Sequence, residues 1–312
     1  MDGTLKSDEG ETNTFNDFSR KAQKKGTRDI SVIYAFDVDL GEPVCSKPYG
    51  GNVIDVSTLE DFIQTNDVDR GVIVTDKGFS YSAAKKAFLD HPDLHFLIPL
   101  KRDSAIIGEY RMYDHDSSLP EYPGMTCRKA RTQLGTFLYS FHDPYRAKKE
   151  EEVWVGEHSE FDPADLSELR KQFGTITFIS DVEMTCLQVY RAYEQRWELE
   201  VMFRFYKNIL ELDETRVHDD MSIIGTEFVN FLSILMTYRL KKAFFKTEAF
   251  REKPYKYVLK RLRRATMIRG SDGEYSLRKI TDKEFDALKE LGVVPTIVDV
   301  KNPVGRPRKK AA

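Results

Sequence analysis

Strand-like and helix-like segments alternate along residues 29–100, and this alternation constrains the possible fold more than any other feature of the sequence. The strand-like runs are short, apolar and rich in β-branched or aromatic residues, as in Asp29–Phe36, Gly71–Thr75 and His95–Leu100. Between them, Ser57–Asp67 and Ser80–Leu89 carry apolar residues at helical spacing. The order predicts an α/β fold built on a mixed sheet with flanking helices.

Residues 103–174 have a different character, with scattered aromatic residues, turn residues and the charged run Lys148–Glu152. We predict a β-rich insertion here. A strand at Thr175–Ile179 follows, then two long helices at Glu183–Leu212 and Met221–Phe245. The predicted organisation is a first part of the main domain at 1–102, the insertion at 103–180, a second part at 181–248, a C-terminal helical region at 249–299 and a basic tail at 300–312.

The overall composition excludes several classes of protein. The 312 residues carry a net charge of −3, which argues against a protein that coats nucleic acid indiscriminately. The three cysteines are widely spaced and show no zinc-binding pattern, so neither a disulfide framework nor a structural zinc is expected. The apolar stretch Phe228–Tyr238 is too short to span a bilayer, and no membrane partner is expected. A cytoplasmic protein is predicted.

The helix at Glu183–Leu212 carries a narrow polar stripe. At 100° per residue, Tyr193, Arg196, Glu200 and Lys207 share an arc of roughly 60° over about 21 Å of helix axis. Apolar residues flank this arc. A solvated face with an Arg196–Glu200 ion pair is one interpretation. The other is a cleft, because a tyrosine, two cations and one carboxylate suit a site that holds DNA phosphates beside a divalent metal.

The pattern Tyr193-x2-Arg196-x3-Glu200-x6-Lys207 resembles the YREK signature of bacterial insertion-sequence transposases with a DDE catalytic domain. The surrounding sequence resembles that family's helix, and Gly225-x2-Phe228-x2-Phe231 resembles the helix after it. The resemblance implies a ribonuclease-H-like fold interrupted by the insertion. It also implies that Glu200 is a metal-binding catalytic carboxylate, and that Tyr193, Arg196 and Lys207 bind DNA.

Two further acidic residues are expected to complete the metal site. Asp76 ends the strand-like run GVIVT, where α/β folds place ligands, and GVIVTDKGFS resembles the family's second-acid segment. A turn or cap aspartate is the alternative. Asp2 matches the family's first acid only through the short segment DGTL. The family carries a DNA-recognition region upstream of this segment, and we expect it to be missing from this chain.

Two other residues are candidates for DNA contact. Trp154 in the insertion would stack against an extruded base, as the resemblance implies, or pack the insertion's own core. Arg306 lies in the tail segment Pro303–Lys310, which resembles an AT-hook that enters the minor groove. A generic basic tail is the alternative.

The resemblance therefore predicts an enzyme that nicks transposon-end DNA and joins the resulting 3′-OH to target DNA. Two Mg²⁺ ions, replaceable by Mn²⁺, would bind to Asp2, Asp76 and Glu200. The expected partners are double-stranded DNA, both transposon ends and target, and a second copy of the chain in a homodimer. A DNA-binding remnant without chemistry and a ribonuclease-H-like nuclease without strand transfer are the alternatives.

Overall fold

The computed structural model divides the chain into two compact units, Met1–Ile234 and Leu235–Ala312. This boundary falls inside a helix, whereas the sequence predicts one after residue 248. The residues that the structure describes are 1–10, 12–19, 28–53, 55–76, 81–88, 91–158, 166–167, 169–208, 210–248, 250–263, 265–278, 280–292 and 297–298.

The first sheet of the larger unit is built on strand β3. Its five strands are β1 (Asp2–Asp8), β2 (Asp17–Phe18), β3 (Arg28–Asp37), β4 (Glu42–Gly50) and β11 (Glu214–Thr215). Strand β3 pairs antiparallel with both β1 and β4, and Asp2 lies opposite Tyr34. Strand β11 pairs parallel with the far end of β1. The sequence predicts β3 closely, but it does not predict β4 or the length of β1.

The second sheet begins with two parallel strands. Its order is β5 (Arg70–Val74), β6 (Asp93–Pro99), β10 (Thr175–Ser180), β9 (Phe137–His142), β8 (Thr126–Arg131) and β7 (Ser117–Ser118). Strands β5 and β6 are parallel because helix α2 (Tyr81–Ala87) carries the chain back between them. The other pairs are antiparallel.

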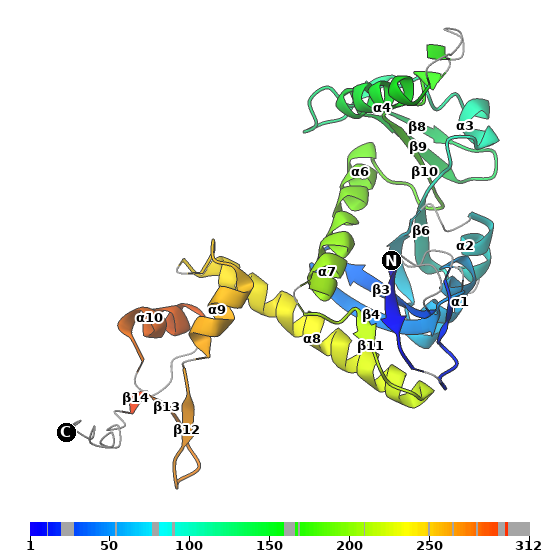
Figure 1. Ribbon diagram of the computed structural model, residues 1–312. Coiled ribbons are helices and arrows are strands. Elements are labelled where there is room, and N and C mark those ends of the chain that lie inside the picture. The colour runs from blue at the N-terminus through cyan, green and yellow to red at the C-terminus, as the bar shows by residue number, and fades with distance from the viewer. Residues whose placement is uncertain are drawn as a thin grey trace. The chain divides into compact units, whose positions relative to one another are not determined.

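The two sheets meet at the start of β1. The Met1 nitrogen donates a hydrogen bond to the Val74 carbonyl oxygen, 2.7 Å away, so β1 begins beside the end of β5. Helix α1 (Asp55–Thr65) connects β4 to β5. Strands β4, β3 and β1 lie side by side in the first sheet, β5 and β6 lie side by side at one end of the second, and helices accompany both sheets (Figure 1). The predicted mixed α/β fold is confirmed.

The insertion between β6 and the next long helix contains strands and helices. It holds β7, β8 and β9, together with α3 (Ala105–Glu109) and α4 (Pro144–Glu157). The 14-residue α4 corrects the β-rich prediction, and the charged run Lys148–Glu152 lies on it. Two local features explain why this helix forms. Asp143 caps it by accepting from the backbone N–H groups of Tyr145 and Arg146, and Pro144 occupies the first turn.

The helix predicted at Glu183–Leu212 is broken in two. Helix α6 (Cys186–Gln195) follows a capping box in which the Thr185 hydroxyl accepts from the Gln188 N–H. Helix α7 (Trp197–Asn208) begins after Arg196, where the hydrogen bonds tighten to three-residue spacing, from Arg196 to Tyr193 and from Leu199 to Arg196. The break corrects the continuous 100° geometry on which the predicted stripe depends.

The broken helix joins the two sheets of the larger unit. On α6, Tyr193 contacts Phe178 of β10, with ring centroids 5.0 Å apart. On α7, Phe203 contacts Tyr34 of β3 at 5.8 Å. Figure 1 shows the two helices following each other along this path. Arg196, at the break, therefore lies between the two sheets' contacts with the helix.

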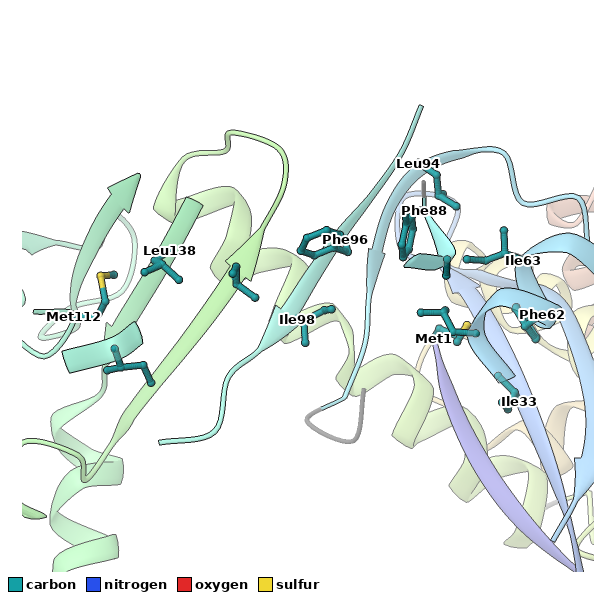
Figure 2. Packing of buried hydrophobic residues seen from close by; sticks show 14 residues of the cluster. Met1, Ile33, Phe62, Ile63, Phe88, Leu94, Phe96, Ile98, Met112 and Leu138 are labelled. Atoms are coloured by element: carbon teal, nitrogen blue, oxygen red, sulfur yellow. The ribbon is translucent and has the colours of Figure 1, made fainter. Parts of the chain in front are cut away.

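The main hydrophobic core lies between helices α1 and α2 and the sheets. Figure 2 shows its labelled residues, among them Ile33 from β3, Phe62 and Ile63 from α1, and Phe96 and Ile98 from β6. A second cluster packs α6 against β8, β9 and β10 through Val189, Phe141 and Phe178. These clusters hold the start of β1, the end of β5 and the helix break in fixed relation.

Helix α8 (Asp220–Lys246) runs for 27 residues, longer than the apolar stretch Phe228–Tyr238 that the sequence suggested. By length and composition alone it qualifies as a membrane-spanning segment, a test that core helices of soluble proteins also pass.

The smaller unit has its own core of Phe244, Phe250, Val258 and Ala287. It contains α9 (Tyr255–Leu262), α10 (Asp282–Glu290) and a small sheet of β12 (Met267–Arg269), β13 (Tyr275–Arg278) and β14 (Ile297–Val298). The sequence predicted helices here, but not the sheet.

Candidate active site

Arg196 connects two of the three predicted catalytic acids. Its Nη2 atom lies 3.0 Å from Oε1 of Glu200, and its Nη1 atom lies 3.7 Å from Oδ2 of Asp2. Because the two terminal nitrogens of a guanidinium are about 2.3 Å apart, those carboxylate oxygens are separated by at most about 9 Å. The fold thus brings Asp2 of β1 and Glu200 of α7 to one cation.

Asp76 lies beside Asp2. It is the second residue after Val74, whose carbonyl accepts from the Met1 nitrogen, and the Thr75 N–H donates to the Leu97 carbonyl of β6. The negative charge of Asp76 is near enough to raise the pKa of the Asp2 carboxyl slightly. The sequence prediction that Asp76 stands at the end of a strand is confirmed, and this strand end is the one that meets β1.

Burial raises the pKa of Asp2 above its ordinary value. The nearby charge of Asp76 adds to this, while the Gly3 N–H, the amino terminus and Arg196 lower the pKa and do not cancel the rise. Asp2, Arg196 and Glu200 therefore form a half-buried group in which two acids pair with one cation. A carboxyl that resists ionisation beside other acids is a feature of functional sites.

Of the other stripe residues, only Tyr193 faces this site. The Arg196 guanidinium carbon lies 5.8 Å from the Tyr193 ring centroid, so the ring supports the guanidinium from the side of α6. Lys207 instead acts on Asp29, whose pKa is raised by burial and lowered by the lysine charge. Asp29 pairs with Ser7 at the far end of β1 from Asp2. The predicted face of four residues is therefore divided between two ends of the sheet.

The donor set suits a hard divalent cation, because carboxylate oxygens are the ligands that Mg²⁺ prefers. The arrangement itself is not yet a metal cage: among the described residues, no three histidine, cysteine, aspartate or glutamate side chains converge closely enough to hold an ion. A cationic group does lie between two of the acids, since the Arg196 guanidinium forms ion pairs with both Asp2 and Glu200. These residues thus fit a divalent ion by the chemistry of their donor atoms.

Trp154 and Arg306 are the two other residues that were predicted to contact DNA. Trp154 is on α4, where its ring stacks on His158 with centroids 4.3 Å apart and lies 6.5 Å from Phe173. A shallow hollow of about 340 Å³ lined by Trp154, Phe173 and Arg102 opens beside it. Trp154 is thus half-buried against its neighbours in the insertion, and stacking on a DNA base stays a prediction. Arg306 lies outside the described residues.

Sequence reasoning missed a cavity of about 260 Å³ beside Arg196. It is lined by residues of β3, β5 and the helix break, including Asp37, Val74, Gln195 and Leu199. Asp37 ends β3, next to the strand that carries Asp2. Its position at a strand end is the one signal in the sequence that pointed to it.

The comparisons with known proteins place this geometry in context. The family model "Transposase DDE domain" matches residues 6–223, a range that includes Asp76, Arg196 and Glu200 and begins after Asp2. No curated protein matches the chain. Among solved structures, the chain is similar to a piggyBac transposase seen by cryo-EM in a synaptic complex with hairpin DNA. The identity is 13%, the TM-score is 0.45, and the match covers 94% of this chain and 51% of the other, so the chain spans about half of that protein's length. Because the family model covers more than two thirds of the sequence, the chain belongs to the transposase DDE domain family.

Proposed function

We propose that this chain carries the catalytic centre of a DNA transposase and catalyses metal-dependent phosphoryl transfer at transposon ends. The observation that carries the proposal is the shared guanidinium: Arg196 binds both Asp2 and Glu200, while Asp76 acts on Asp2 from the adjoining strand end. Family membership supplies the class of reaction. The YREK-type pattern at Tyr193–Lys207 supports an insertion-sequence origin.

Asp2, Asp76 and Glu200 would hold two divalent ions, Mg²⁺ or Mn²⁺ in its place. Such ions activate an attacking oxygen and stabilise the leaving oxygen. The protein's own part is to bring together three carboxylates from β1, from the segment just after β5 and from α7, and to keep Asp2 and Glu200 partly buried. Arg196 balances their charge in the free protein and, held against the Tyr193 ring, is placed to contact a DNA phosphate.

The reaction would proceed in two transfers. In the first, water attacks the phosphodiester at the transposon end, one P–O bond forms, one breaks, and a 3′-OH is released. In the second, that 3′-OH attacks a target phosphodiester, and the displaced target strand leaves with its own 3′-oxygen protonated. Each transfer conserves the number of P–O bonds, so neither needs an external energy source.

Metal binding and strand transfer test this proposal separately. Mn²⁺ titration of the chain by calorimetry should show binding that is weakened in Asp76→Asn and Glu200→Gln. The matched control is Glu198→Gln, which removes an exposed carboxylate from the same turn of α7. Mn²⁺ binding that is equal in all four proteins would refute the assignment of these acids.

The second assay combines the chain with Mn²⁺, a precut duplex from the inverted repeat of its own element, and a supercoiled plasmid. Joined product that depends on Glu200 supports transposase activity. Nicked plasmid without joined product would favour a nuclease. Metal binding without either product would favour the DNA-binding remnant. The last reading has one specific observation behind it, the absence of a converged three-ligand group among the described residues.

A further inference from the structure

The near-neutral charge of the whole chain conceals a strong division between its two units. Residues 235–312 contain 21 Lys and Arg residues against nine Asp and Glu, a net charge of +12. Residues 1–234 contain 27 against 42, a net charge of −15. Without the tail, residues 235–298 still hold 16 basic and eight acidic residues. The smaller unit is therefore the basic part of an otherwise acidic chain.

Helix α9 concentrates this charge on one face. Val258 on its inner side is fully buried, and Tyr255 and Leu262 pack against the core of the smaller unit. On the outer side, Lys256, Lys260 and Arg263 are exposed. Arg263 continues the helical bonding, since its N–H donates to the Leu259 carbonyl at 2.9 Å. The three cations therefore share an arc of roughly 60° and extend over about 10 Å of helix axis.

A row of three cations at this spacing suits a regular array of negative charges. Duplex DNA presents one phosphate per roughly 3.4 Å along each strand, so about three phosphates fall within the length of the row. Helix α9 is short, and its inner face packs against the core of the smaller unit. The outer face therefore offers a partner positive charge and not an apolar groove.

The negative charge of the larger unit gives a reason for a basic surface elsewhere on the chain. With a net charge of −15 it repels DNA as a whole, although the proposed catalytic acids lie within it. Divalent ions at three carboxylates offset only a small part of that charge. A basic element on the same chain would offset this repulsion and raise the affinity for DNA.

We propose that the smaller unit, Leu235–Ala312, holds the phosphate backbone of duplex DNA, and that Lys256, Lys260 and Arg263 of α9 make these contacts. The inference rests on the proposed function for its choice of DNA over another polyanion. It assigns contact with the DNA backbone, because the spacing of the three cations along the helix matches that of phosphates along one strand.

The test is fluorescence anisotropy of the full chain with a labelled 30-base-pair duplex of arbitrary sequence, in EDTA, at several NaCl concentrations. The variant carries Lys256→Gln, Lys260→Gln and Arg263→Gln. Each lost phosphate contact reduces the slope of log K against log salt by about 0.9, so three contacts reduce it by about 2.7. The matched control removes three exposed cations from the larger unit by Lys85→Gln, Lys86→Gln and Arg111→Gln.

A weaker affinity and shallower slope in the α9 variant, with the control close to wild type, supports the proposal. Equal affinity and slope in all three proteins overturns it, as does a wild-type chain that does not bind the duplex at low salt. An unchanged slope with altered sedimentation also overturns it, because the basic face would then bind an acidic unit of another copy. If the triple variant is misfolded by circular dichroism, Lys260→Gln alone replaces it, with an expected slope change of about 0.9.

Mn²⁺ binding separates this outcome from a failure of the proposed function. The α9 variant should bind Mn²⁺ as wild type does, because the metal-binding acids are in the other unit. Loss of DNA binding with retained Mn²⁺ binding isolates the phosphate surface.

Discussion

Lys6 of β1 and Glu227 of α8 form an ion pair, with 2.5 Å between Nζ and Oε1, and their side chains are only 1% and 2% exposed. The Asn230 amide donates to the same carboxylate oxygen and the Tyr206 hydroxyl to the other. The pair ties the strand that begins with Asp2 to the helix after α7. The ion pair therefore helps to hold strand β1, which carries Asp2, in place against helix α8.

Breaking this pair should destabilise the protein strongly. Lys6→Met or Glu227→Gln leaves one buried group without its partner, and we expect each to reduce the free energy of unfolding by about 3–5 kcal/mol, measured by urea denaturation. The double variant Lys6→Met/Glu227→Leu should cost less than the sum of the single changes, because it leaves no unpaired charge. Strict additivity would show that the two charges are not coupled.

Replacing Asp2 with asparagine should stabilise the protein at neutral pH. Because the folded-state pKa of Asp2 is raised, the ionised carboxylate costs stability above that pKa, and the cost disappears as the pH falls through it. Asp2→Asn should therefore unfold at a higher temperature than wild type at pH 7. The difference should shrink as the pH falls from the raised pKa toward the ordinary pKa of an aspartate, and it should be absent below that ordinary value. The exposed Asp69→Asn serves as the control. A lower melting temperature for Asp2→Asn at pH 7 would contradict the effect of burial.

Removing Arg196 should strengthen metal binding while it weakens catalysis. In the free protein, the guanidinium occupies the position between Asp2 and Glu200 as a competing cation. Arg196→Gln should lower the Kd for Mn²⁺ by about tenfold, which corresponds to about 1.4 kcal/mol, and it should reduce strand transfer. Calorimetry and the joining assay measure the two effects. Arg204→Gln, which changes an exposed arginine on the adjoining helix α7, should alter neither.

The capping box of α6 should contribute measurably to stability. The Thr185 hydroxyl accepts from the Gln188 N–H, and Thr185→Ala should reduce the free energy of unfolding by about 1 kcal/mol. Thr185→Ser should retain most of the stability because it keeps the hydroxyl. Thermal unfolding in a calorimeter compares the three proteins. Equal losses for alanine and serine would mean that the cap is not the source.

Local pattern was sufficient for the elements that carry the site. The β-branched runs predicted β3, β5 and β6 within a few residues, since buried strands need those side chains. Asp76 could be placed because its strand end is visible in the sequence. Asp2 was predicted only because the four residues DGTL resemble the family's first-acid segment. Its place beside Asp76 follows from strand order, which no local pattern specifies.

What the sequence did not predict depends on tertiary contacts. The break at Arg196 replaces one long helix because α6 packs on Phe178 and α7 on Tyr34, which belong to different sheets. Lys207 consequently faces Asp29. The ion pair of Lys6 with Glu227 joins residues that are distant in the chain, and the sequence around each of them does not indicate the other as its partner.

The antiparallel pairing of β10 with β6 has a consequence for how this protein tolerates change. The chain leaves β6 at Pro99 and enters β10 at Thr175, and Phe178 lies opposite Pro99. The excursion between them grows outward strand by strand to β7, which forms the outermost edge of that sheet among the described residues. Lengthening the chain or grafting a segment at β7 would thus leave the hydrogen bonds between β10 and β6 intact, so the outer strands can change in length and sequence without disturbing the strands that lie next to the candidate site.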